Sequence, residues 1–243
     1  MVCVNRVIVV GARGRMGSLI VQTASADPTL EVIGTYDADN CAELDEAAPA
    51  ADVVIDFSSP AALEHTLAYV RRTGAALVCG TTGLDDEQLA EIQEAGKVAP
   101  VIHAANYSLG VAALRRATAM VAQALDGWDV EIVETHHNKK VDAPNGTAKM
   151  LLAAVDPEGT AEVVGGREGQ VGARRAGEIG MHALRGGTVA GTHDVHFFGN
   201  DEEVCLTHRA TSRQIFVSGA VAAAKRICGR EPGSYDFDGL MFD

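Results

Sequence analysis

Short apolar runs rich in β-branched residues recur through the first hundred residues, with helix-like stretches between them. Runs of this kind are typical of strands buried on both faces of a parallel sheet. The predicted strands cover residues 6–10, 30–36, 52–57, 76–79 and 101–104. The predicted helices run from residue 16 to just before Pro28, from Ser59 toward Gly74 and from Asp85 to about Ala95. This alternation predicts an α/β fold, a Rossmann-like doubly wound parallel sheet.

Two of these helices carry recognisable start signals. Ser59 and Pro60 suit the cap and first position of a helix, because proline fits where the backbone N–H has no partner within the helix. Asp85 with Gln88 matches a capping box, in which each side chain binds the other residue's backbone N–H. We therefore expect helices to begin at both points.

The pattern changes after about residue 108. A helix is predicted over 108–126, a strand over 129–135, a helix over 148–155 and a hairpin of strands 194–198 and 203–208 around Gly199-Asn200-Asp201. The glycine- and arginine-rich segment 159–187 has little periodicity and predicts an extended loop. A last helix over 212–228 is expected to return to the first domain. The predicted domains are a dinucleotide-binding domain, 1–107 with 214–243, and a smaller α+β substrate-binding domain, 108–213, with a mixed or antiparallel sheet.

Charge and cysteine content narrow the function classes. The 243 residues include 33 acidic and 20 basic ones, a formal net charge of −13, which repels nucleic acids and anionic membranes. Such an acid excess also suits a salt-loving host, a hypothesis that stays open. No apolar run is long enough to span a membrane and no signal peptide is visible. The five cysteines form no CxxC pair, which predicts reduced thiols in a cytoplasmic protein.

A glycine-rich turn joins the first strand to the first helix. Gly11, Gly14 and Gly17 have the spacing GxxGxxG, with Arg13 where the commonest dinucleotide fingerprint has a glycine. Small residues let the backbone approach a pyrophosphate at the positive end of a helix. Asp37, at the end of the second strand, can accept hydrogen bonds from a ribose diol. Gly80-Thr81-Thr82-Gly83 follows a later parallel strand, and we expect it at the same edge of the sheet.

A second concentration of chemistry lies in residues 134–147, where two histidines and two lysines follow a strand. The amides of Gly146 and Thr147 can bind a carboxylate with Lys140 supplying charge. Either a histidine or Lys140 can be the proton source in a reduction. A zinc site with His193, His196 or His208 is the competing interpretation, but adjacent histidines rarely face one metal, and we expect no metal. A purely structural loop is the third alternative.

Seven segments together resemble the dihydrodipicolinate reductase family, the 4-hydroxy-tetrahydrodipicolinate reductases of the diaminopimelate route to lysine. They are VGARGRMG at 10–17, DFSSP at 56–60, GTTG at 80–83, AANYSLGV at 104–111, THHNKKVDAPNGT at 135–147, RGGTVAGTH at 185–193 and THRATSR at 207–213. The resemblance implies an enzyme that uses NADH or NADPH to reduce 4-hydroxy-tetrahydrodipicolinate, a cyclic dicarboxylate, to tetrahydrodipicolinate with loss of water. It also implies a homotetramer.

The resemblance also implies roles for particular residues. His136 and Lys140 are the catalytic candidates, and His137, Gly146 and Thr147 the candidates for holding substrate carboxylates. Arg213 is expected at a hinge or in an assisting role. The candidates for cofactor binding are Gly11, Ala12, Arg13, Gly14, Arg15, Met16, Asp37, Gly80, Thr81, Thr82, Ala104, Ala105, Asn106 and Tyr107.

Three positions depart from the family's pattern. Asn145 replaces the serine usual before Gly-Thr, Ala112 stands where asparagine often occurs, and Ala38 stands where some members have arginine. Asp37 suits NADH and opposes a 2′-phosphate, whereas Arg15 and Arg13 can attract that phosphate, so we expect dual use with NADH preferred. Two alternatives remain: a reductase of another cyclic imine, and a redox-sensing binding protein that uses the nucleotide domain as a switch.

Overall fold

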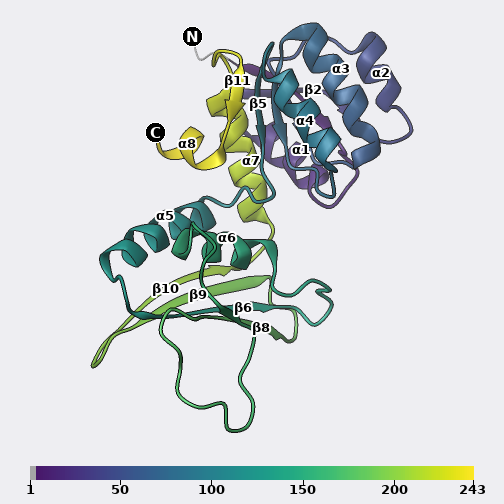
Figure 1. Cartoon of the computed structure of the whole chain (residues 1–243). Helices are drawn as coiled ribbons and strands as arrows, with labels where there is room; N and C mark the ends of the chain where they lie inside the picture. The colour runs from purple at the N-terminus through teal and green to yellow at the C-terminus, as the bar shows by residue number, and fades with distance from the viewer. Residues whose placement is uncertain (1–3) are drawn as a thin grey trace. The chain divides into compact units, whose positions relative to one another are not determined.

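The computed structural model describes residues 4–243, which divide into two compact units (Figure 1). The first unit comprises the chain up to Leu109 together with Gln214–Asp243, and the second comprises Gly110–Arg213. The final segment therefore lies in the first unit.

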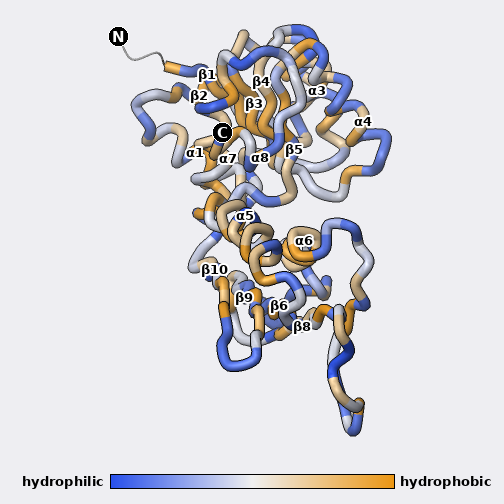
Figure 2. Tube along the Cα trace, turned by 60° about the vertical axis from the view of Figure 1, so that its left-hand side comes forward, coloured by the Kyte–Doolittle hydropathy of each residue, from blue (hydrophilic) through white to orange (hydrophobic). Residues whose placement is uncertain are grey.

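The first unit is built on a parallel sheet, which has six strands in the described part of the chain, in the order β2-β1-β3-β4-β5-β11. The strands are β1 (Asn5–Val10), β2 (Leu30–Tyr36), β3 (Val53–Asp56), β4 (Ala76–Cys79), β5 (Pro100–His103) and β11 (Gly233–Tyr235). The central strands are mostly in the hydrophobic colours of Figure 2. Every residue of β3 and β4 is buried, as continuous apolar runs require.

Helices cover both faces of this sheet, which confirms the doubly wound prediction. Leu44, Leu67 and Ile92 pack with Ile8 and Val54 in one cluster. The three residues named first come from the helices α2 (Cys41–Ala47), α3 (Leu63–Thr73) and α4 (Asp86–Ala95), and the other two come from strands. The second layer is formed by α1 (Gly17–Ala26) and α7 (Gln214–Ile227), with α8 (Phe237–Phe242) against α7. Successive side chains of a strand point to opposite faces of the sheet, so each strand packs against both helix layers.

Of the two predicted helix starts in this unit, one has the expected cap and the other does not. The capping box of Asp85 and Gln88 is present, with both reciprocal hydrogen bonds formed. Ser59, in contrast, makes no side-chain cap hydrogen bond, and a 3₁₀ turn, η1 (Pro60–Ala62), precedes α3. Gly74 ends α3 in the left-handed conformation at φ 71°. The short elements α2, β11 and α8 were not predicted.

The second unit has a mixed sheet, with five strands among the described residues, in the order β10-β9-β6-β8-β7. Its strands are β6 (Asp129–His136), β7 (Val163–Val164), β8 (Ile179–Arg185), β9 (Gly191–Phe198) and β10 (Glu203–Ala210). The predicted hairpin is confirmed as β9 and β10, which pair antiparallel. The prediction of an extended loop over 159–187 is wrong for β8, which pairs parallel with β6 along its whole length.

Two helices, α5 (Leu109–Ala124) and α6 (Gly146–Val155), lie along one face of this sheet (Figure 1). Leu114 and Leu151 from the helices pack with Ile132, Val195 and Phe197 from the strands. Side chains at alternate positions of β6 point to the other face. The covered face of β6 carries Val130, Ile132, Glu134 and His136, all buried, so the core of the second unit continues directly into a row of polar side chains.

Candidate functional site

The glycine turn between β1 and α1 is shaped by close backbone contacts. Gly11 has φ 79°, and a Cβ atom there would lie 2.6 Å from the carbonyl oxygen of Phe57. A Cβ atom on Gly17 would lie 2.0 Å from the carbonyl oxygen of Gly11. Both positions therefore exclude any side chain, as the fingerprint predicts.

The start of α1 offers a cradle for an anion. No side-chain cap hydrogen bond forms at its N-terminus, and its first turn contains no acidic residue. The positive end of the helix dipole is therefore left without a side-chain cap or an acidic residue to complement it. This arrangement fits the pyrophosphate of a dinucleotide.

Asp37 and Arg13 are bound to each other at the end of β2. The backbone N–H of Arg13 donates to Oδ1 of Asp37 at 3.1 Å, which fixes the orientation of that carboxylate. The guanidinium of Arg13 donates to both carboxylate oxygens of Asp39, at 3.0 and 2.9 Å, and its Nε lies 3.4 Å from Asp37. Arg13 therefore faces two carboxylates, and Asp39 was not identified from the sequence.

Two residues that were predicted to contact the cofactor use their side chains in hydrogen bonds to other protein groups. The hydroxyl of Thr81 donates to the buried carboxylate of Asp56 at 2.9 Å and accepts from the N–H of Ser58. The hydroxyl of Tyr107, which is 1% exposed, donates to the carbonyl oxygen of Cys79 at 2.8 Å. Thr81 and Tyr107 thus shape the carboxyl edge of the sheet through their side chains and offer mainly backbone groups to a ligand.

In the second unit, His136 ends β6 and is oriented by Glu134. Nδ1 of His136 lies 2.5 Å from Oε2 of Glu134, whose side chain is fully buried. The two residues are separated by one position on a strand, so their side chains share a face. Glu134 was not among the predicted site residues, although its position two residues before His136 is visible in the sequence.

Arg185, on the neighbouring strand β8, holds the same carboxylate from its other side. Its guanidinium donates to both oxygens of Glu134 at 2.8 and 2.7 Å. Burial raises the pKa of Glu134, but the hydrogen bonds from Arg185 and His136 outweigh it and keep that pKa below its ordinary value. The carboxylate is therefore charged, and at this distance it accepts from a protonated Nδ1 of His136.

Asn145 links two histidines and the start of α6. Its Oδ1 accepts from the N–H of Ala148 at 2.8 Å, a cap that fixes which end of the amide carries the nitrogen. Its Nδ2 lies 3.2 Å from Nε2 of His136 and 3.0 Å from Nε2 of His193. The amide can thus donate one hydrogen to each ring, and the rings of His136 and His193 meet edge to face at 5.3 Å.

Burial, together with His136 and His208, lowers the pKa of His193 to about 4. His193 is therefore neutral at physiological pH. Its Nδ1 is buried and has no hydrogen-bond partner in the described structure. From the sequence, His193 was a candidate only for a metal site.

The remaining candidates surround this network. Lys140 donates to Oδ1 of Asp142 at 2.7 Å, and Arg185 donates to the carbonyl oxygen of Asp142, so one guanidinium joins the Lys140 loop to Glu134. Gly146 and Thr147 form the first turn of α6, with Gly146 exposed. Nδ1 of His137 is buried without a partner in the described structure. Cationic, donor and acceptor groups thus gather around one helix N-terminus, a fitting site for an anion.

Comparison with known proteins shows which family the chain belongs to. The family model for the N-terminus of dihydrodipicolinate reductase matches residues 5–107, and the model for its C-terminus matches residues 110–241. The chain belongs to the dihydrodipicolinate reductase family. The family uses NADH or NADPH, and the chain is an oxidoreductase of this kind.

Relatives in this reductase family match over nearly their whole length. The 4-hydroxy-tetrahydrodipicolinate reductase of Akkermansia muciniphila is 44% identical over 97% of each chain. That of Caldanaerobacter subterraneus is 39% identical over 97% of this chain and 98% of its own. The solved dipicolinate-bound dihydrodipicolinate reductase from Paenisporosarcina sp. TG-14 has a TM-score of 0.79 at 24% identity, covering 98% of this chain and 100% of that one, and confirms the fold.

Proposed function

We propose that this reductase converts 4-hydroxy-tetrahydrodipicolinate to tetrahydrodipicolinate and water in lysine biosynthesis through diaminopimelate. The reaction consumes one NADH or NADPH and one proton. The observation that carries the proposal is the Glu134–His136 pair beside the N-terminus of α6, where a dicarboxylate finds both charge and backbone donors. The nicotinamide, when bound, supplies the hydride.

In this proposal, one unit binds the dinucleotide and the other binds the substrate. The first unit holds the dinucleotide with residues 11–16, Asp37, residues 80–82 and residues 104–107. The uncapped start of α1 and the side-chain-free positions at Gly11 and Gly17 support this role. The second unit holds the substrate carboxylates with His137, Gly146 and Thr147, and it supplies the proton.

We assign the proton to Lys140 rather than to His136. Nε2 of His136 accepts a hydrogen bond from Asn145, while Glu134 holds the proton on Nδ1. The resting imidazole therefore offers no proton at Nε2, whereas the ammonium of Lys140 has three. His136 then acts by accepting hydrogen bonds and by positioning Asn145 and the bound ring.

The direct test follows NADH or NADPH oxidation by this chain with freshly made product of the dihydrodipicolinate synthase reaction. The proposal requires turnover with this substrate well above that with other cyclic imines. His136→Gln is expected to lower kcat by about 10²-fold, because it removes the group that positions Asn145 and the bound ring, while the Kd for the cofactor stays unchanged. Equal kcat in this variant and the wild type refutes the role of His136.

Lys140 can be tested by separating charge from proton transfer. Arginine keeps the positive charge but does not release a proton. Lys140→Arg should therefore keep KM within a few-fold while kcat falls by about 10²-fold or more. Lys140→Met should raise KM as well. An active Lys140→Arg variant contradicts the assignment of the proton.

We further propose a cytoplasmic homotetramer. Cys41, Cys79, Cys205 and Cys228 are free thiols, which suits a reducing compartment, and Cys3 lies outside the described residues. No helix of the described structure is long and apolar enough to cross a membrane. Within residues 110–213 both helices lie on one face of the sheet, and Leu184 and Phe198, 49% and 39% exposed, lie on the other.

An uncovered sheet face with apolar side chains favours assembly through the second unit. Light scattering of the wild type should give the mass of four chains. Leu184→Asp should lower that mass, whereas Val171→Asp, which charges a similarly exposed apolar residue of the 165–178 loop, should not. A monomeric wild type contradicts the proposal.

A further inference from the structure

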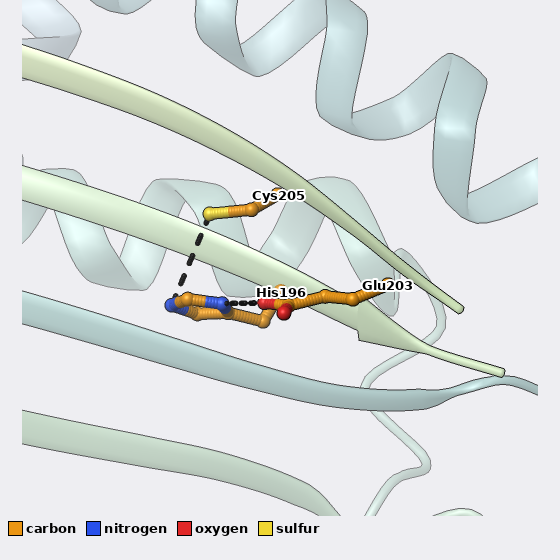
Figure 3. A group of neighbouring side chains, drawn as sticks. All are labelled: His196, Glu203 and Cys205. Carbon is orange, nitrogen blue, oxygen red and sulfur yellow. Dashed lines mark hydrogen bonds and ion pairs between the residues drawn. The ribbon is translucent and has the colours of Figure 1, made fainter. Parts of the chain in front are cut away.

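A cluster of metal-ligand side chains lies on β9 and β10, outside the site described above. It consists of His196, Glu203 and Cys205 (Figure 3). His196 and Cys205 are directly opposite each other in the antiparallel ladder. His193, Val195 and Phe197 are buried on the helix side of β9, so His196 points to the uncovered face. Position in the sheet therefore fixes the two side chains next to each other.

The imidazole of His196 is held in one orientation. Its Nδ1 lies 2.5 Å from Oε1 of Glu203, and its ring is stacked parallel on Phe198 at a centroid distance of 5.7 Å and an angle of 1°. The carboxylate fixes a proton on Nδ1, which leaves Nε2 as a lone-pair donor. Nε2 lies 4.0 Å from Sγ of Cys205 (Figure 3).

This arrangement has the parts of a transition-metal site. Zinc binds imidazole nitrogen at about 2.0–2.1 Å and thiolate sulfur at about 2.3 Å, so two tetrahedral ligands of this kind are separated by roughly 3.5 Å. The observed separation of 4.0 Å closes to that value with a small side-chain rotation. A carboxylate on the far nitrogen of a ligating histidine is the usual outer partner, because it orients the ring and raises its basicity.

We propose that His196 and Cys205 bind a divalent thiophilic cation of the zinc type, with Glu203 holding His196 from behind. Nε2 and Sγ are the two ligands from this chain, and water or a group of a second chain assembled on this face fills the other positions. The thiol of Cys205 releases its proton to solvent when the metal binds. Residue types decide the class of metal, because a thiolate and an imidazole exclude Mg²⁺ and Ca²⁺, which prefer oxygen.

The surroundings favour a cation. Asp194, next along the same face of β9, accepts from the hydroxyl of Thr207 at 2.7 Å, and that hydroxyl lies 3.6 Å from Sγ of Cys205. Asp201 and Glu202, in the turn that joins the two strands, add negative charge close to Glu203. An ordinary surface pair of His196 and Glu203 explains their hydrogen bond, but it does not explain the thiol opposite Nε2.

Equilibrium dialysis of the metal-free, reduced full chain against Zn²⁺ tests the proposal. The wild type should bind one Zn²⁺ per chain at this site with a Kd in the micromolar range or below. His196→Ala and Cys205→Ser should each raise that Kd by about 100-fold or more, and Glu203→Gln by about 10-fold, the effect of an outer partner. Cys228→Ser, a matched thiol control in another unit, should bind as the wild type does.

Cobalt gives the test a spectroscopic signature. Co²⁺ bound by the wild type should show thiolate-to-metal charge-transfer absorption, and Cys205→Ser should lose that absorption. Fluorescence of Trp128, whose ring contacts the hairpin turn at Gly199, reports that the hairpin remains folded in each variant. Light scattering shows whether the mass is unchanged. Zinc binding that survives in both His196→Ala and Cys205→Ser, or cobalt absorption without a thiolate band, overturns the proposal.

Discussion

Oε2 of Glu134 accepts a hydrogen bond from Nδ1 of His136 at 2.5 Å, and both side chains lie on the helix-covered face of β6. Arg185 donates to both oxygens of the same carboxylate, so Glu134 is charged although its side chain is fully buried. A buried carboxylate with two such partners fixes the tautomer of the imidazole and the direction of its second nitrogen. Glu134 is thus a positioning residue for His136.

Glu134→Gln should lower kcat by about 10²-fold. The neutral amide no longer requires the proton on Nδ1, and a proton on Nε2 then faces the NH₂ group of Asn145. Binding of NADH, measured by fluorescence titration, should not change, because Glu134 belongs to the other unit. Steady-state kinetics with the substrate provides the measurement.

Glu131→Gln is the matched control for this variant. Glu131 lies on the same strand and is also paired with arginines and a histidine, but on the opposite face. The control should keep kcat within about two-fold, the range of a remote substitution. Equal losses in the two variants would mean that the ion pairs of β6 act through stability alone.

Asn145→Ala should destabilise the second unit by about 1–3 kcal/mol, because it removes the cap of α6 and leaves two buried imidazole nitrogens without a donor. Asn145→Ser keeps a capping hydroxyl and should lose about 1 kcal/mol or less. Urea unfolding followed by the fluorescence of Trp128, the single tryptophan, measures both, since it packs on the core of that unit. A serine variant as unstable as the alanine variant contradicts the role of the cap.

The sequence predicted most of the first unit because its signals are local. The β-branched runs, the capping box and the glycine turn each depend on a few neighbouring residues. The strand β8 was missed for a physical reason. A Cβ atom at Gly180 would lie 1.6 Å from Oε2 of Glu131, so a long side chain from β6 occupies the place of a side chain on β8. The strand therefore needs a glycine at this position, and because glycine is typical of loops, it hid the strand in the sequence.

The candidate site shows the same division. His136, His137 and Lys140 are close in sequence and could be found together. Arg185 and His193 begin and end the segment RGGTVAGTH, but their contacts with the site could not be predicted, because these contacts depend on strand register. His136 pairs with Arg185 in the parallel ladder, and Glu134 pairs with His193 in the antiparallel one. Such pairings join distant segments and leave no local pattern.

Asp39 should contribute to a preference for NADH over NADPH. Arg13 is exposed but donates to both oxygens of Asp39, and Asp37 lies beside its Nε. A 2′-phosphate bound beside Arg13 therefore also meets two carboxylates. Asp39→Ser should raise kcat/KM with NADPH about ten-fold, through KM, and change kcat/KM with NADH less than two-fold.

Arg13→Ala provides the complementary variant. It removes the charge that attracts the 2′-phosphate and should lower kcat/KM with NADPH more than with NADH. A wild type with a strong NADPH preference, or an Asp39→Ser variant with an unchanged ratio, contradicts the proposed basis of selectivity. Kinetics with both cofactors at one ionic strength is required, because exposed charges are screened by salt.

His193 should make the second unit sensitive to acid. Its folded-state pKa is lowered from 6.5 to about 4, chiefly by burial. The folded chain therefore resists a proton that the unfolded chain accepts. This contribution to stability is complete above pH 6.5 and is lost as the pH falls toward about 4, a change of up to about 3 kcal/mol.

His193→Gln removes this titration while keeping a polar side chain of similar reach. The free energy of unfolding of the variant, measured by Trp128 fluorescence, should therefore fall less than that of the wild type between pH 7 and pH 4.5, roughly the window of the titration. The acid-induced loss that remains in the variant is then assigned to carboxylates such as Glu134, whose lowered pKa places their contribution at lower pH. Parallel pH profiles in the variant and the wild type would show that His193 is not the group responsible.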